Sequence, residues 1–477
     1  MTIDLFFGIL LFSLMTYGLK RLNFIGSKNG IIDNSIEIIT SIGISIGIIS
    51  VLFFISLISN FNNQICLVLI LIVSLIIFLL PKCPNINKQG AVQLNTLVKP
   101  IFGRSSFNLR TLLLICATLA FVITNMYFLL QAFTHPVGDF DAIMIYNLRA
   151  NFLFYCGSDW HLAFSPLLFW SNLDYPLLVP CFTAWVWRLL NNNLDIVIII
   201  QAIFFAEATI SLVFLALLKL KKNDEAYLAI LGMYTIPFYF FITGNKYIDV
   251  YLSFYLFVAV MFLYFYDTKI LPKSVLILAG IMLGFTAWIK NEGLYIALSI
   301  ILSRALSVFL YRKKSLKQNF VVIFNESIPI IIGMIPGMIA LLLFKFKITS
   351  HNWLFDTQSN FSLFMLLTDF HNWSKVLFYM FILIINFGDW IVSPILLMIF
   401  CFVLSKRKLN KLEQKSLFSI WLSIIIILCI EILIFVLCGD TALTRIAFSG
   451  PRLILQLWPI FMFLFGLQVD LKLKNTN

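Results

Sequence analysis

The sequence predicts an all-α protein that crosses a membrane many times. Of its 477 residues, 61% are hydrophobic and only 12% are charged, whereas soluble domains average about 25% charged residues. Long apolar runs recur from one end of the chain to the other, and a helix needs roughly 20 such residues to cross a bilayer. A membrane β-barrel would instead show short segments of alternating polarity, so the pattern favours a helical bundle.

Loop charge predicts how these helices are oriented. Most of the 34 lysines and arginines fall into seven clusters, and the positive-inside rule places all seven in the cytoplasm. This distribution accounts for the formal net charge of +12 without a nucleic-acid partner. The clusters are Lys20 to Lys28, Lys82 to Arg110, Lys219 to Lys222, Lys269 to Lys273, Arg312 to Lys317, Lys406 to Lys415, and Lys472 with Lys474.

Thirteen crossings satisfy this constraint, with the N-terminus outside and the C-terminus inside. The apolar segments 176–190 and 374–388 are short for a bilayer, and counting either as a crossing would put a basic cluster on the wrong side, so we expect both to lie along the outer interface. The expected crossings are 3–19, 36–59, 64–80, 111–133, 194–218, 226–243, 247–267, 273–289, 294–311, 320–344, 390–405, 416–438 and 452–468.

The stretch "GDFDAIMIYNLRANFLF", residues 138–154, opens the longest outer loop and carries two carboxylates. Asp139 and Asp141 each have two interpretations. Either can cap the helix that follows, or it can act as a general base in a partly desolvated position at the membrane edge. Arg149 lies eight residues after Asp141 and would share its face of a helix, where it could bind phosphate or hold the carboxylate.

Further charged and polar residues fall in the other predicted outer segments. The turn in "GFTAWIKNEGLY" is the sharpest signal, because Lys290 interrupts two apolar runs; it either snorkels or meets a lipid phosphate. The remaining cations on that face are suited to an anionic head group. The full set of candidate binding residues is Arg149, Asp174, Tyr175, Lys246, Asp249, Lys290, Glu292, Arg445 and Arg452.

Three glutamates fall inside predicted crossings, where ionisable groups are energetically costly. Glu207, Glu326 and Glu431 could form a proton path, although we expect each to pair with a neighbouring helix. The histidines lack HxxxH spacing and the cysteines lack CxxC pairs, so no metal site is predicted. No nucleotide-binding fingerprint is present.

The order of the motifs is similar to that of a known family. "DFDAIMIYNLRANFLF", "DYPLLVP", "YIDVYLSF", "GFTAWIKNEGL" and "SGPRLILQLWP" together resemble bacterial GT-C superfamily glycosyltransferases, in the branch of the protein mannosyltransferases and the aminoarabinose transferase of lipid A. The resemblance covers about residues 110–465. In the first motif, Phe140 and Met144 replace tryptophans of the family pattern, and Arg149 replaces a common lysine.

The resemblance implies a GT-C-like bundle with juxtamembrane helices on its outer face. Residues 1–109 would form an N-terminal three-helix region with a cytoplasmic linker. Residues 110–312 would form the catalytic membrane core with the outer loop 135–193, and residues 313–477 a C-terminal membrane region with the outer loop 345–389.

The implied reaction moves a sugar from a polyprenyl-phosphate donor to a hydroxyl of a glycan, lipid or protein at the outer face of a bacterial plasma membrane, with inversion. Asp141 would be the base, with Asp139 as its rival, and Lys290 would hold the donor phosphate. No cofactor is certain, and a divalent cation stays open. The alternatives are a surface-polysaccharide polymerase or ligase, and a lipid or polysaccharide transporter, whose inverted repeats or broken helices are not evident here.

Overall fold

The computed structural model describes residues 3–25, 30–82, 109–311, 315–349, 363–390, 393–405 and 407–470. Every regular element within these ranges is a helix, and they contain no strand. The chain is therefore an all-α protein, as predicted. Most of the expected linker, the middle of the loop 345–389, and the basic residues Lys472 and Lys474 lie outside the described residues.

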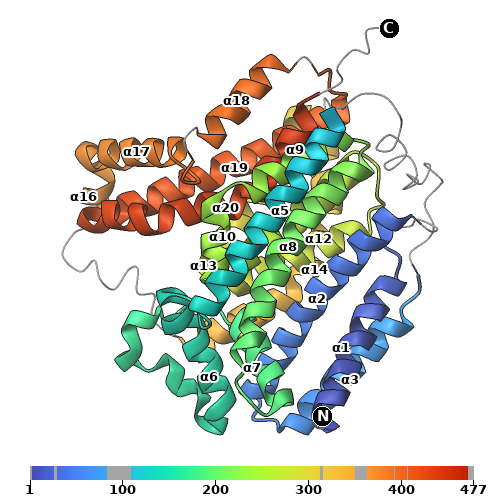
Figure 1. The fold of residues 1–477 in the computed structure, drawn as a ribbon, viewed down its shortest axis with the longest axis vertical. Coiled ribbons are helices and arrows are strands. Elements are labelled where there is room, and N and C mark those ends of the chain that lie inside the picture. The colour runs from blue at the N-terminus through green and yellow to red at the C-terminus, as the bar shows by residue number, and fades with distance from the viewer. Residues whose placement is uncertain are drawn as a thin grey trace.

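Three N-terminal helices form one side of the bundle (Figure 1). They are α1 (Ile3–Arg21), α2 (Ile31–Ile58) and α3 (Asn63–Leu79). At the end of α1 the guanidinium of Arg21 donates to the carbonyl of Phe78 and lies over its ring, 4.7 Å from the centroid. The ends of α1 and α3 are thereby joined, so these two helices run in the same direction.

The core of the bundle is built around α11 (Asp249–Asp267), from which nearly every side chain is buried. Phe and Tyr rings of α11 pack against rings of α8 and α20, which fills the core with aromatic volume. The helices around it are α5 (Leu109–Thr134), α8 (Asp195–Lys219), α9 (Asn223–Tyr234), α10 (Pro237–Gly244), α12 (Val275–Ile289), α13 (Asn291–Tyr311), α14 (Leu316–Lys347), α19 (Lys411–Leu437) and α20 (Ala442–Gln468).

One expected crossing is broken in the structure. The segment 226–243 forms α9 and α10, whose axes differ by 58°. Pro237 causes the break, because proline lacks an N–H and forces the residue before it out of the helical conformation. Ile236 is accordingly extended, with ψ of 108°.

Helices α12 and α14 pack with their backbones in direct contact. A Cβ added to Gly280 would lie 2.0 Å from the carbonyl oxygen of Ile330, and one added to Gly337 would lie 2.2 Å from that of Gly284. Such small residues four apart allow close helix contact in membranes. The stretch "GMIPG", residues 333–337, is therefore helix-packing sequence.

Shorter elements lie at the periphery. The chain after α5 forms a single π-helical turn, η1 (Ala142–Asn147), then α6 (Leu148–Tyr155), the 3₁₀ segments η2 (Gly157–Phe164) and η3 (Pro166–Ser171), and α7 (Leu178–Leu190). Near the C-terminus, α16 (Leu363–Thr368), α17 (Phe370–Ile385) and α18 (Pro394–Leu404) lie on the side away from α1 and α3 (Figure 1). The 3₁₀ turn η4 (Gly439–Thr441) precedes α20.

The structure supports a protein that crosses a membrane several times. Eight helices of the described chain are long and apolar enough to cross, or nine if α9 and α10 count as one span. Each of the thirteen expected crossings coincides with a helix or with this bent pair, but α1, α3, α12 and α18 do not satisfy the same requirement. The count of thirteen is therefore not confirmed.

Several of the basic clusters meet at one end of the bundle. Lys219 at the end of α8 pairs with Asp33 at the start of α2 at 2.5 Å, and Arg110 at the start of α5 pairs with Asp224 at the start of α9 at 2.7 Å. A 25-residue helix such as α8 is about 37 Å long, so its other end is remote from this region. We call the end marked by Lys219 the basic end.

Candidate functional site

A cavity of about 740 Å³ lies at the end of the bundle opposite the basic end. Five separate parts of the chain line it: the segment after α5, the segment before α7, α10 with the turn that follows it, the junction of α12 and α13, and the first half of α20. One wall is apolar and includes Phe238, Phe241 and Phe448. The predicted site residues that line it are Asp139, Asp141, Asp174, Tyr175, Lys290, Glu292, Arg445 and Arg452.

Gly138 sets the direction in which the chain enters this cavity. Its φ is +90°, and an added Cβ would lie 2.5 Å from the carbonyl oxygen of Asn245, so only glycine fits. The exposed Asp139 that follows accepts a hydrogen bond from the N–H of Phe140 at 2.7 Å and one from the hydroxyl of Tyr247 at 3.3 Å. Both contacts hold the Asp139 carboxylate at the cavity wall.

Asp141 stands at the start of η1 but makes no capping hydrogen bond there. Its carboxylate instead accepts from Nη1 of Arg452 at 2.5 Å, and its side chain is 22% exposed. The helix-cap interpretation of Asp141 is therefore wrong. The carboxylate is partly accessible from the cavity and is held by a cation from the other end of the chain.

Asp249 lies beneath the cavity, fully buried, and joins its two central cations. Oδ2 accepts from Nε of Arg452 at 2.8 Å, whereas Oδ1 accepts from Nζ of Lys290 at 3.1 Å and from the amide of Gln456 at 2.6 Å. Three donors thus offset the cost of burying this charge. Asp249 does not line the cavity, and it positions the residues that do.

Lys290 and Glu292 occupy the tight junction between α12 and α13. Lys290 is extended, with φ of −145°, which ends α12 and turns its side chain into the core. Nζ lies 3.3 Å from Oε1 of Glu292, while Oε2 of Glu292 is buried and has no hydrogen-bond partner within the described chain. Burial opposes the charge of Lys290, but Asp249 and Glu292 outweigh it and raise the pKa of the ammonium. Lys290 is therefore a buried cation and does not snorkel.

Asp174 and Tyr175 reach the cavity from the segment before α7. The side-chain amide of Asn291 donates to Asp174 at 2.7 Å, and Nζ of Lys345 donates to the Asp174 carbonyl at 2.5 Å. The Tyr175 hydroxyl lies 3.5 Å from Oε1 of Glu292, at the limit of a hydrogen bond. The segment "SNLDY", residues 171–175, therefore belongs to the same wall of the cavity as the Lys-Asn-Glu-Gly turn, residues 290–293.

Arg149 lies behind the wall and does not hold Asp141. Its guanidinium is fully buried and donates to the backbone carbonyls of Ser171, Asn172 and Tyr175 at 2.5–3.1 Å. The expected shared face was wrong, because the wider π-helical turn η1 separates Asp141 from Arg149 and changes the register by about one residue, or roughly 100°. Burial lowers the pKa of Arg149 to about 10.

Lys246 also lies away from the cavity. Its ammonium donates to the carbonyl of His135, near the end of α5, and its side chain is nearly completely buried. This burial lowers its pKa to about 8. The expectation that Lys246 faces an anionic head group in this cavity is therefore not met, because its ammonium donates to the carbonyl of His135 instead.

Three side chains of this region were not predicted as site residues. The Tyr247 ring lies 4.5 Å from the Arg452 guanidinium, Gln456 donates to Asp249, and Lys345 holds Asp174. For Gln456 a signal was present, since it is a polar residue in an apolar helix four positions after Arg452 and so shares its face.

Arg445, a predicted site residue, lines the cavity and donates to the Thr441 hydroxyl at 3.2 Å.

The glutamates within the helices are held by neighbouring residues at three separate places. Glu207 accepts from Tyr234 at 2.5 Å and from Asn125 at 3.1 Å. Glu326 pairs with Arg304 at 3.2 Å, and Glu431 accepts from the hydroxyl of Tyr295. Each contact crosses to another helix, as the pairing interpretation expects.

The cavity offers both signs of charge but no evident metal cage. Among the described residues, no three His, Cys, Asp or Glu side chains are grouped so as to hold a metal ion.

Comparisons of the chain with known protein families, with curated proteins and with solved structures find no match. A functional assignment therefore depends on the residues of the cavity and on the motif resemblance.

Proposed function

We propose that this chain is an integral membrane glycosyltransferase of the GT-C type, with about thirteen crossings. It transfers a sugar from a polyprenyl-phosphate donor to a hydroxyl of a glycan, lipid or protein acceptor. The observation that carries the proposal is the meeting, in one cavity, of two carboxylates from the segment after α5 with cations from the α12–α13 junction and α20. A reaction between an anionic donor and a neutral acceptor uses both kinds of group.

In the proposed mechanism Asp141 removes the proton of the acceptor hydroxyl. The oxygen attacks the anomeric carbon as the bond to the phosphate oxygen breaks, and the bonding electrons leave with the phosphate, so one displacement inverts the configuration. The phosphate leaves as an anion and needs no proton, so one carboxylate suffices, unlike the pair in a glycosidase. Asp139 lines the same cavity and is the rival base.

Lys290, Arg445 and Arg452 supply the positive charge for the donor phosphate. A guanidinium can bind two phosphate oxygens at once, whereas the Lys290 ammonium acts as a compact point charge. The apolar wall with Phe238 and Phe241 suits the first isoprene units of the donor. Asp174, Tyr175 and Glu292 supply acceptors and a hydroxyl for the sugar.

The proposal places the protein in a bacterial plasma membrane with this cavity on the outer face. Its support is the charge pattern, because the loops that line the cavity lack the basic clusters that mark cytoplasmic loops. A lipid-linked donor in the outer leaflet would then lie level with the cavity. A divalent cation, if one takes part, would have to be held together with the donor phosphate.

The test replaces the carboxylates one at a time. Asp141→Asn keeps the shape but cannot accept a proton, so transfer from polyprenyl-phosphate sugar in proteoliposomes should fall by about 10²- to 10⁴-fold. Asp139→Asn should retain most activity. Donor binding should stay near the wild-type value in both variants, whereas thermal stability should do so only for Asp139→Asn, because Asp141 pairs with Arg452.

Lys290→Ala separates the binding role from the proton transfer. It should raise the KM for the donor, because it removes a phosphate partner and not the base. If Asp139→Asn is inactive while Asp141→Asn turns over normally, the other carboxylate is the base. Normal turnover in both variants would refute the proposed mechanism.

A further inference from the structure

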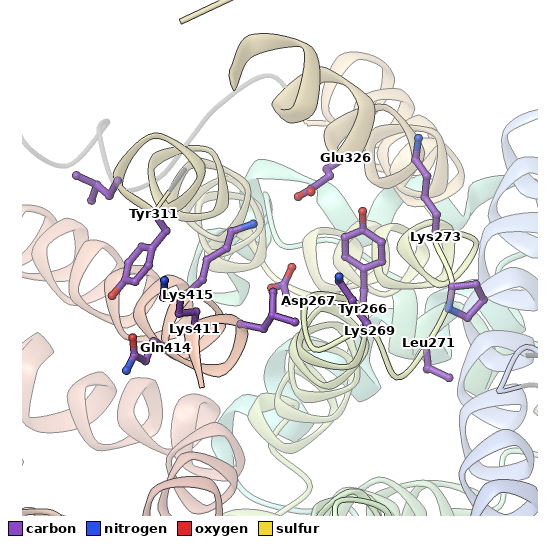
Figure 2. Close-up of a pocket in the computed structure, with 13 residues that line it drawn as sticks. Tyr266, Asp267, Lys269, Leu271, Lys273, Tyr311, Glu326, Lys411, Gln414 and Lys415 are labelled. Carbon is purple, nitrogen blue, oxygen red and sulfur yellow. The ribbon is translucent and has the colours of Figure 1, made fainter. Parts of the chain in front are cut away.

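We infer that the basic end of the bundle carries a second binding site, which takes the phosphate-bearing head group of an anionic phospholipid. The site is a cavity of about 980 Å³ among the ends of α11, α13 and α19 (Figure 2). It lies at the opposite end of α11 from the cavity described above. Nothing in the proposed sugar transfer uses it.

Four lysines from two segments surround this cavity. Lys269 and Lys273 come from the turn between α11 and α12, whereas Lys411 and Lys415 come from the first two turns of α19. Figure 2 shows Lys415 on the same side of the cavity as Tyr311, with Lys273 on the opposite side beside Tyr266. The lysines therefore approach the hollow from two directions, as needed to enclose an anion.

The carboxylates at this cavity already have partners. Asp267 makes a bidentate contact with Arg304 at 2.8 and 3.0 Å and also accepts from Ser416, and Glu326 pairs with the same guanidinium at 3.2 Å. These groups leave the lysines unneutralised: within the part of the chain that the structure describes, no ion pair involves any of the four.

The two cavities thus differ in their charge balance. At the first cavity, Lys290 and Arg452 are both paired with carboxylates. At the second, four ammonium groups face a hollow whose two carboxylates are shared with one buried arginine. Like charges gathered in this way repel one another, so an anion of more than one oxygen would stabilise the arrangement.

The surroundings favour a lipid over a soluble anion. Leu310 of α13 lines the cavity and is 65% exposed, and α14, which contributes Glu326 to the lining, carries Phe320 and Phe324 at 62% and 66% exposed. Acyl chains lying along these helices would place their head group among the lysines. Basic pockets between membrane helices bind anionic head groups by this combination of charge and apolar surface.

The experiment measures lipid binding to the full chain in detergent by native mass spectrometry. Phosphatidylglycerol is titrated against phosphatidylcholine with the same acyl chains, because choline cancels the phosphate charge. The double variant Lys411→Gln/Lys415→Gln should bind phosphatidylglycerol roughly 10- to 30-fold more weakly and phosphatidylcholine unchanged. A separate arm adds excess inorganic phosphate, which should not displace the lipid.

A matched control removes the same charge elsewhere at the same end. Lys221 and Lys408 are exposed and do not line the cavity, so Lys221→Gln/Lys408→Gln should bind phosphatidylglycerol like the wild type. Equal losses in both double variants would mean that only diffuse charge attracts lipid, and would overturn the inference. So would unchanged binding in the cavity variant, or displacement of the lipid by inorganic phosphate. None of these outcomes depends on sugar transfer.

Discussion

Asp249 and Lys246 show how differently two buried charges are accommodated a few positions apart. Asp249 has two cations and an amide around its oxygens, so its negative charge is fully compensated. Lys246 donates to a backbone carbonyl, that of His135, and burial lowers its pKa. Removing the charge should therefore have opposite effects at the two positions.

For Asp249→Asn we expect a loss of stability of about 3–5 kcal/mol, because the substitution leaves Lys290 and Arg452 buried with less counter-charge. Thermal unfolding in detergent would show this as a clear fall in the midpoint. The matched change Asp139→Asn, at an exposed carboxylate with no ion pair among the described residues, should cost less than about 0.5 kcal/mol. Equal midpoints for the two variants would contradict the bridging role.

The lowered pKa of Lys246 predicts that the free energy of unfolding rises with pH. Its pKa is about 8 in the folded chain, against an ordinary value of 10.5, so between these values the unfolded chain binds more protons. Stability from this group therefore increases as pH rises from about 8 to 10.5, by at most about 3 kcal/mol. Lys246→Met should remove that increase, which unfolding midpoints across this pH range would measure. An unchanged pH profile would show that the ammonium is not desolvated.

The sequence predicted which residues line the cavity better than it predicted which of them contact one another. The motifs pointed to Asp141, Lys290 and Arg452, and all three line one cavity. The sequence could not reveal that Arg452 contacts Asp141 across 311 positions, because such pairing depends on how the helices pack. It also placed Arg149 in the site, since the interpretation assumed an unbroken α-helix through a segment that forms a π-turn.

At the scale of elements, the contact between α12 and α14 is the most demanding packing arrangement described above. Carbonyl oxygens of one helix occupy the space where side chains would begin on the other. Backbone cannot move aside as a flexible side chain can, so these positions tolerate no added atom without separating the helices.

Gly337→Ala should therefore destabilise the protein by about 1–3 kcal/mol, since its Cβ would lie 2.2 Å from the carbonyl oxygen of Gly284. The control is Gly466→Ala, where the nearest atom is the flexible end of Leu217 at 2.5 Å. We expect the control to be close to neutral in thermal unfolding. A Gly337 variant as stable as the control would show that the two helices can separate at little cost.

Helices were predicted well because long apolar runs require them in a membrane. Breaks within an apolar run were harder to predict. The segment 226–243 was predicted as one crossing, yet Pro237 divides it into α9 and α10. The length of a run also does not determine whether a helix crosses, which is why α7 and α17 were expected at the interface on topology alone. Their helical form agrees with that expectation but does not test it.

For the whole molecule, the positive-inside rule predicts which end faces the cytoplasm. In a cysteine-free background, a membrane-impermeant thiol reagent added outside should label a cysteine at Ser158 and not one at Ser315. Both positions are exposed, so accessibility of the side chain does not limit the reaction. Labelling at Ser315 alone would reverse the orientation and place the first cavity on the cytoplasmic side.

The bridge at Asp249 also has a consequence for biosynthesis. Lys290 follows Asp249 by 41 positions and Arg452 by 203. At about 5–20 residues per second, Lys290 is made roughly 2–8 s after Asp249, whereas Arg452 is made roughly 10–40 s after it. Between these two times Lys290 is the only one of the two cations that the nascent chain can offer to Asp249. The first cavity is thus completed only after α20 has been synthesised.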